Sequence, residues 1–174
     1  MSDEDVSEIS LDQLVLIVGL STAGKSASLR NIRNQQNWMY LGTEAGKRLP
    51  FQNKFQRFNI TDPFQVEEAF IYATEEDPSV EGMIVDSMTF LMDMFETQYV
   101  LGSSNTMQGW SDYAQFFKRI MQSHVPTFGK SVIIIAHVKD ELDEKAGEMK
   151  TFVPIKGALK NNGVEALVIS ALAA

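Results

Sequence analysis

The sequence predicts an α/β domain with a mainly parallel central sheet flanked by helices. Three observations support this prediction. Short apolar runs that end in glycine, aspartate or histidine recur along the chain and are typical of buried parallel strands. Segments with helical periodicity separate most of these runs. The first run, LVLIVG, leads directly into a glycine-containing turn and then a helical pattern, as in a βα unit.

The individual elements follow from these patterns in chain order. Each expected strand is a short apolar run, and each expected helix repeats apolar residues every three or four positions. The helix that starts near Thr61 or Asp62 has Pro63 in its first turn, which is a strong start signal. The expected strands are 13–19, 37–42, 55–60, 82–87, 131–137 and 165–174, and the expected helices are 25–33, 61–76, 88–101 and 111–123.

Two polar stretches are predicted to be connections. Residues 102–109 form a loop between two helices, and residues 138–154 form a long charged connection that is too polar for the core. The segment PFQNKFQRF interleaves phenylalanine with Lys54 and Arg57, a pattern that could stack nucleic-acid bases. Packing against the sheet is the favoured interpretation. The methionines of SMTFLMDMF recur at helical spacing and are expected in the core.

Length and composition suit a single intracellular domain. The chain has 174 residues, 44% of them hydrophobic, with no cysteine and no apolar run of membrane-spanning length. Its first residues are acidic and polar, unlike a signal peptide. We therefore expect a flexible acidic tail at 1–12, one core domain at 13–174, no membrane contact and a cytoplasmic location.

Charge is distributed very unevenly along the chain. The formal net charge is −8, but residues 25–57 carry seven bases and one acid, whereas residues 62–112 carry eleven acids and no base. An acidic protein is a poor non-specific ligand for nucleic acid, because that binding depends on neutralising phosphates. The basic block could still form a local surface for a polyanion, or it could be an ordinary solvated surface.

The stretch GLSTAGKS at 19–26 fits the phosphate-binding loop G-x-x-x-x-G-K-[ST] in full, between an apolar strand and a helix. Its glycines let the backbone wrap around phosphates, Lys25 neutralises the β- and γ-phosphates, and the Ser26 hydroxyl can bind Mg²⁺. We therefore predict a site for ATP and Mg²⁺. The expected nucleotide-binding residues are Gly19, Ser21, Thr22, Ala23, Gly24, Lys25, Ser26 and Ala27.

Three polar residues that follow predicted strands could complete this site. Asp86 follows a buried run and could hold Mg²⁺, or it could simply cap the next helix. Glu44 follows the second strand and could activate water, or it could pair on the surface with Lys47 or Arg48. His137 follows SVIIIA and could hydrogen-bond the γ-phosphate, or it could be a satisfied loop residue.

With these residues in place, the chain resembles the RecA-like core ATPases, and among them the phage Sak-type single-strand annealing or recombination ATPases. The resemblance lies in IVGLSTAGKSASLRN, YLGTEAGKRLPF, GMIVDSMTF and VIIIAHVKDE, which occur in the family's order. It implies a RecA-like P-loop NTPase core that hydrolyses ATP, with Glu44 activating water, Asp86 near Mg²⁺ and His137 sensing the γ-phosphate. Ser-Thr-Ala before Gly24 departs from the expected glycine-rich dipeptide but removes no phosphate ligand.

The resemblance also implies partners. Copies of the chain would assemble as a ring or filament with ATP between them, and Lys156 or Lys160 of one copy would reach the γ-phosphate bound by the next. Single-stranded DNA would face the loops near 102–110 and 139–155, and a single-strand-binding protein would be a further partner. If the chain is encoded by a phage, its location would be the host cytoplasm. The available DNA phosphate contacts are Lys139, Lys145 and Lys150, which share the second loop with five acids.

Two other functions remain open at the level of sequence. A P-loop kinase would usually cover the phosphates with an arginine-rich lid, whereas no arginine follows Arg119. A non-catalytic, nucleotide-gated module would use ATP to order loops that hold a protein partner, and the acid-only block 62–112 would suit a basic partner. ATP hydrolysis that DNA stimulates would distinguish the leading prediction from both.

Overall fold

The computed structural model describes residues 14–155, and five of its strands form one parallel sheet. The predicted α/β class with a parallel central sheet is therefore confirmed. The predicted strand at 165–174 lies outside the described residues. In spatial order the strands are β1 (Leu14–Gly19), β5 (Ser131–His137), β4 (Gly82–Asp86), β2 (Trp38–Gly42) and β3 (Gln56–Asn59).

The register of the sheet brings the predicted functional residues to one edge. Gly19 at the end of β1 pairs with His137 at the end of β5, and Gly42 at the end of β2 pairs with Asp86 at the end of β4. Because all the strands are parallel, their carboxyl ends meet at this edge. The loops that follow β1, β2, β4 and β5 therefore begin close together.

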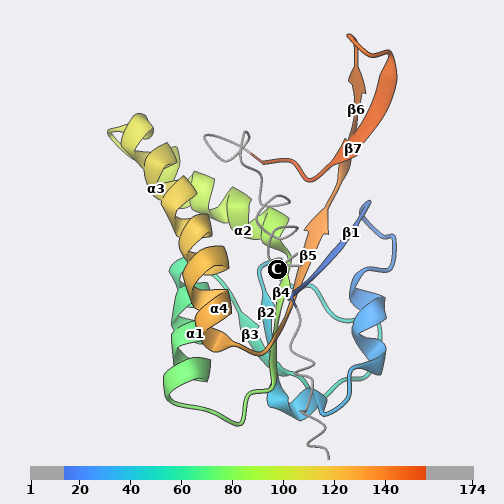
Figure 1. The fold of residues 1–174 in the computed structure, drawn as a ribbon, viewed down its shortest axis with the longest axis vertical. Coiled ribbons are helices and arrows are strands. Elements are labelled where there is room, and N and C mark those ends of the chain that lie inside the picture. Colours follow the sequence, from blue (N-terminus) through green and yellow to red (C-terminus); the bar gives the residue numbers. More distant parts are fainter. Residues whose placement is uncertain (1–13, 156–174) are drawn as a thin grey trace, which may run out of the picture.

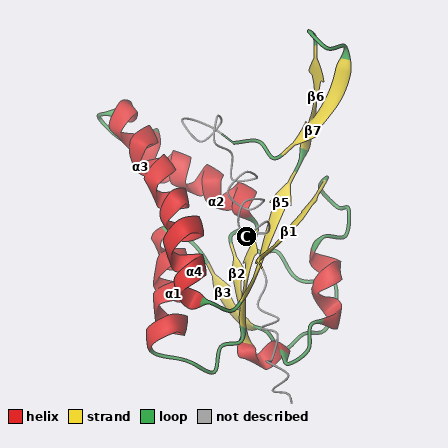
Figure 2. Cartoon of the chain, in the orientation of Figure 1, coloured by secondary structure: helices red, strands yellow, loops and turns green. Residues whose placement is uncertain are grey.

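Helices cover one face of the sheet and bury the larger core (Figures 1 and 2). The methionines at helical spacing are core residues as predicted, because Met88 and Met92 are buried. Within residues 14–155, no helix is long and apolar enough to cross a membrane. The helices are α1 (Phe64–Glu75), α2 (Met88–Phe95) with the π turn η3 (Glu96–Val100), and α3 (Thr106–Arg119), which continues through η4 (Ile120–His124) into α4 (Val125–Phe128).

The helix predicted at 111–123 begins earlier than the sequence pattern indicated. The side chain of Asn105 caps α3 by accepting a hydrogen bond from the Gln108 N–H at 3.1 Å. The loop predicted at 102–109 is therefore wrong over its second half. Gly109 lies inside the helix, where a Cβ atom would come within 3.0 Å of the η3 backbone. The glycine at this position therefore allows α3 to pack closely against η3, and it does not mark a loop.

The opposite face of the sheet has a thinner cover. It consists of the short helices η1 (Ser26–Asn31) and η2 (Gln35–Asn37) and the connection that follows β2. Phe55 is buried there and Phe51 packs beside it, so the packing interpretation of these phenylalanines is confirmed, whereas Phe58 is exposed.

The helix predicted at 25–33 is shorter than expected and has 3-10 geometry. The hydroxyl of Ser28 donates to the carbonyl oxygen of Lys25 at 2.6 Å, and its N–H bonds to the same oxygen at 3.3 Å. Local hydrogen bonds of this kind favour a tight turn over a regular α-helix. The backbone then becomes extended at Ile32.

The charged connection predicted at 138–154 contains an antiparallel hairpin, which the sequence analysis did not predict. Strands β6 (Lys139–Asp143) and β7 (Glu148–Phe152) project beyond the carboxyl end of β5 (Figure 1). The turn between them is closed by the Gly147 N–H, which donates to the carbonyl oxygen of Asp143 at 2.7 Å, with Gly147 at a φ of +68°. Most of the hairpin is exposed, in agreement with its predicted exclusion from the core.

Gly82 gives a direct test of this packing. It pairs with Trp38 across β4 and β2, and an added methyl group would overlap the indole ring. We expect Gly82→Ala to lower the free energy of unfolding by about 1–3 kcal/mol, because the indole must move. Gly102→Ala is the matched control, since its Cβ would meet nothing closer than 3.5 Å. Equal denaturant midpoints for the two variants would contradict this packing.

Candidate functional site

The phosphate-binding loop, the connection that follows β2 and the end of β5 enclose one cleft at the carboxyl edge of the sheet. The cleft has a volume of about 380 Å³. Gly24 adopts a φ of +81° in this loop, a conformation that glycine takes without strain. Of the predicted nucleotide-binding residues, Gly19 and Ala23 are not in the lining. The lining residues are Ser21, Thr22, Gly24, Lys25, Ser26, Ala27, Glu44, Lys47, Arg48, Pro50 and His137.

Lys25 is folded back onto its own loop. Its ammonium group donates to the carbonyl oxygens of Gly19 at 2.9 Å and Leu20 at 2.6 Å, and the residue is buried. Burial, followed by the charge of Lys47, lowers the pKa of Lys25, while Asp86 and Glu44 oppose the shift. Backbone carbonyls are weak substitutes for phosphate as partners of an ammonium group. The Lys25 ammonium group therefore lies at the cleft, and phosphate oxygens can replace the two backbone carbonyls as its partners.

Ser26 lines the cleft and contacts Asp86, which lies behind it and is not itself a lining residue. The Ser26 hydroxyl donates to Asp86 Oδ2 at 2.7 Å, across 60 positions of sequence, and Asp86 is fully buried. A hydroxyl and a carboxylate are hard oxygen ligands that suit Mg²⁺, which is commonly held by few protein groups plus phosphates and water. The described residues contain no cluster of three His, Cys, Asp or Glu side chains that could bind a metal alone. The pair therefore fits a Mg²⁺ ion that arrives with a nucleotide.

Two further residues contact Asp86, and the sequence analysis did not place either of them there. Tyr40 donates its hydroxyl to Asp86 Oδ2 at 2.7 Å, and the Lys47 ammonium lies 2.8 Å from Oδ1. Burial, together with the adjacent Asp86 charge, raises the pKa of Tyr40, so its hydroxyl stays protonated as a donor. A tyrosine inside the apolar run WMYLG was the available sign of a buried polar partner.

Glu44 lies at the mouth of the cleft, just beyond β2. Its carboxylate is 36% exposed and lies 3.3 Å from the Lys47 ammonium. The predicted surface pairing with Lys47 is therefore present, and the same carboxylate also lines the cleft. The pairing interpretation is therefore confirmed, and the role of Glu44 in activating water stays a prediction.

His137 is buried in part against α2 at the end of β5. Its backbone N–H donates to the Thr89 hydroxyl at 2.9 Å, and its ring packs edge-on against Phe90. Its Nε2 atom has no hydrogen-bond partner among the described residues although it is buried. Burial and then the charges of Lys25 and Lys47 lower its pKa, so the imidazole is neutral near pH 7. A buried polar atom without a protein partner needs one from water or from a ligand.

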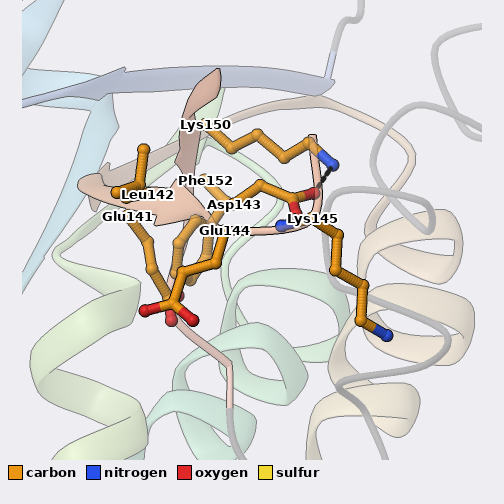
Figure 3. A pocket seen from close by; sticks show the side chains of 7 residues that line it. All are labelled: Glu141, Leu142, Asp143, Glu144, Lys145, Lys150 and Phe152. Carbon is orange, nitrogen blue, oxygen red and sulfur yellow. Dashed lines mark hydrogen bonds and ion pairs between the residues drawn. The ribbon is translucent and has the colours of Figure 1, made fainter. Parts of the chain in front are cut away.

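The lysines predicted to contact DNA lie on the hairpin, away from this cleft. A separate hollow of about 570 Å³ opens there and shares no lining residue with the cleft. Figure 3 shows Lys150 directed at Asp143, to which it is paired, and Lys145 pointing away. Lys139 is exposed at the base of β6. Lys156 and Lys160, the predicted contacts to a neighbouring copy, lie outside the described residues.

Comparison with known proteins agrees with this geometry. A family model described as an AAA domain matches residues 12–168, which is most of the chain. A search of curated proteins found no significant match.

Proposed function

The chain belongs to the AAA domain family of P-loop ATPases, and we propose that it hydrolyses ATP with Mg²⁺ in the P-loop cleft. We further propose that several copies assemble with ATP between them and bind single-stranded DNA, as in phage annealing or recombination ATPases. In such an assembly Lys156 or Lys160 of a neighbouring copy would contact the γ-phosphate.

The observation that carries the ATPase proposal is the direct Ser26–Asp86 contact at 2.7 Å, made by a serine that lines one cleft together with Lys25 and Glu44. Mg²⁺, when bound there with ATP, would neutralise charge on the phosphate oxygens. Lys25 would exchange its loop carbonyls for phosphate oxygens. Glu44 would accept a proton from the attacking water as the water oxygen bonds to the γ-phosphorus and ADP leaves.

His137 is suited to a sensing role. A neutral imidazole can hydrogen-bond a phosphate oxygen through Nε2, the atom that has no partner among the described residues. His137 is also the last residue of β5, and the β6–β7 hairpin begins two residues later. Loss of the γ-phosphate would remove the partner of His137 at the base of the hairpin. We propose this connection as the route by which hydrolysis is communicated to the hairpin.

The thin face of the sheet supplies a better surface for DNA phosphates than the hairpin does. The cation of Arg30 lies over Phe51 at 5.7 Å, and that of Arg57 lies over Tyr40 at 5.3 Å. Residues 25–57 contain one acid, Glu44, whereas the hairpin mixes its lysines with five acids. Phosphate binding depends on net positive charge. The exposed residues of this surface, here the basic belt, are Arg30, Arg33, Arg48, Lys54 and Arg57.

Charge reversal distinguishes the two surfaces. The double variant Arg30→Glu with Lys54→Glu is expected to weaken binding of a fluorescent single-stranded oligonucleotide about tenfold or more at low salt. It should also remove DNA stimulation of ATP hydrolysis while hydrolysis without DNA persists. The matched control is Lys139→Glu with Lys145→Glu on the hairpin. A larger loss in the control would assign DNA to the hairpin, and no binding by the wild type would refute the DNA proposal.

A further inference from the structure

Lys47 connects the two carboxylates to which the proposed function gives chemical roles. Its ammonium nitrogen lies 2.8 Å from Asp86 Oδ1 and 3.3 Å from Glu44 Oε2. The first carboxylate is fully buried and the second lines the mouth of the cleft. One flexible side chain therefore bridges Asp86, on the proposed metal side of the site, and Glu44, on the proposed water side.

The charge of Asp86 explains why a cation is needed at this position. A buried carboxylate is very unfavourable unless a cation or several donors compensate it. Ser26 and Tyr40 supply two neutral donors to Oδ2, so neither compensates the charge. Lys25 is the other nearby lysine, but its ammonium bonds to loop carbonyls. Lys47 is therefore the cation that balances Asp86 when no metal is bound.

The anchoring of Lys47 allows its side chain to move while its backbone stays in place. Its carbonyl oxygen accepts a hydrogen bond from Arg57 at 2.9 Å, and its N–H bonds to the Glu44 carbonyl at 3.3 Å. Its side chain is 22% exposed at the rim of the cleft. The ammonium group can therefore leave Asp86 for solvent without disturbing β2 or the loop.

We propose that Lys47 is an exchangeable counter-cation: it occupies the Asp86 carboxylate in the metal-free state and leaves when the cleft takes up a divalent cation. The same movement separates Lys47 from Glu44 and frees that carboxylate to accept a proton. Lys47 would then couple binding of the metal ion to the release of Glu44, the residue proposed to activate water. This inference rests on the proposed function, because it assumes that Asp86 faces the metal.

Metal affinity tests the exchange directly. Mn²⁺ suits the same oxygen ligands as Mg²⁺, and electron paramagnetic resonance measures its free concentration in solution. We expect Lys47→Met to bind Mn²⁺ about tenfold or more tightly than the wild type, because a competing positive charge is gone. Lys47→Arg should restore the wild-type affinity. Lys118→Met removes an equal charge from an exposed position of α3, outside the cleft, and should change the affinity less than twofold.

A labelling experiment on the wild type avoids any risk that the variant misfolds. An amine-acylating reagent with mass spectrometry should modify Lys47 faster with a non-hydrolysable ATP analogue and Mg²⁺ than with the analogue and Na⁺ at equal ionic strength. Lys130 is the internal control, because it is also half-buried and its ammonium bonds to the Pro78 and Val80 carbonyls at 2.8 and 2.6 Å. Its rate should not change.

The outcomes separate this inference from the proposed function. Unchanged or weaker Mn²⁺ binding by Lys47→Met would overturn the proposed exchange. A labelling rate of Lys47 that does not change when Mg²⁺ is added would overturn it as well. If neither the wild type nor Lys47→Met binds Mn²⁺, even with a non-hydrolysable ATP analogue, the proposed ATPase site itself is refuted.

Discussion

Glu44→Gln is expected to slow ATP hydrolysis by about 10²- to 10⁴-fold while ATP is still bound. The glutamine keeps the size of the side chain and an oxygen that can accept from Lys47, which lies 3.3 Å from the Glu44 carboxylate. It cannot accept a proton from water, so the loss should appear in kcat. Phosphate release and binding of a fluorescent ATP analogue, measured on the same preparation, separate the two effects.

The control for this change is Glu68→Gln, the same substitution at an exposed position of α1. It should leave both measurements unaltered. A Glu44→Gln variant that hydrolyses ATP at the wild-type rate would show that another group activates water. A variant that loses ATP binding instead would place Glu44 in nucleotide binding.

Lys25→Met is expected to lower kcat/KM for ATP hydrolysis by about 10²- to 10³-fold. Methionine reproduces the apolar stem of the lysine but removes its charge. The bonds lost in the nucleotide-free protein go to the Gly19 and Leu20 carbonyls, at a cleft that water can enter. The fold should therefore be retained, and the substitution should affect the binding and hydrolysis of ATP.

Thermal unfolding provides the necessary check on Lys25→Met. Its Tm without nucleotide should be close to that of the wild type, whereas the rise in Tm caused by Mg²⁺ and an ATP analogue should largely disappear. An undiminished rise would mean that the nucleotide binds elsewhere or without Lys25.

The strands and the phosphate-binding loop were predictable because their signals are local. A run such as SVIIIAH has few alternatives to a buried strand, and GLSTAGKS defines the loop residue by residue. The convergence of Glu44, Asp86 and His137 also followed from sequence, since carboxyl ends of parallel strands share an edge. Position after a strand was thus enough to place these three residues at that edge, and their chemical roles stay predictions.

Other features depend on contacts that a linear pattern does not reveal. The hairpin was missed because its strands lack apolar alternation and its register depends on a charged turn around Asp143. The early start of α3 was missed because a glycine such as Gly109 indicates a loop in a sequence pattern. Only its close contact with η3 explains a glycine inside the helix. Lys47 looked like a surface base because its partner Asp86 lies 39 positions away in sequence.

The most direct test of the ATPase site is phosphate release by the purified wild-type protein under multiple turnover, with Mg²⁺ and with EDTA. The geometry predicts many phosphates released per chain with Mg²⁺ and almost none with EDTA. Binding of ATP without turnover, even with Mg²⁺ and single-stranded DNA, would contradict hydrolysis and favour a nucleotide-gated module. Transfer of phosphate to an added nucleoside monophosphate instead of water would contradict it in favour of a kinase.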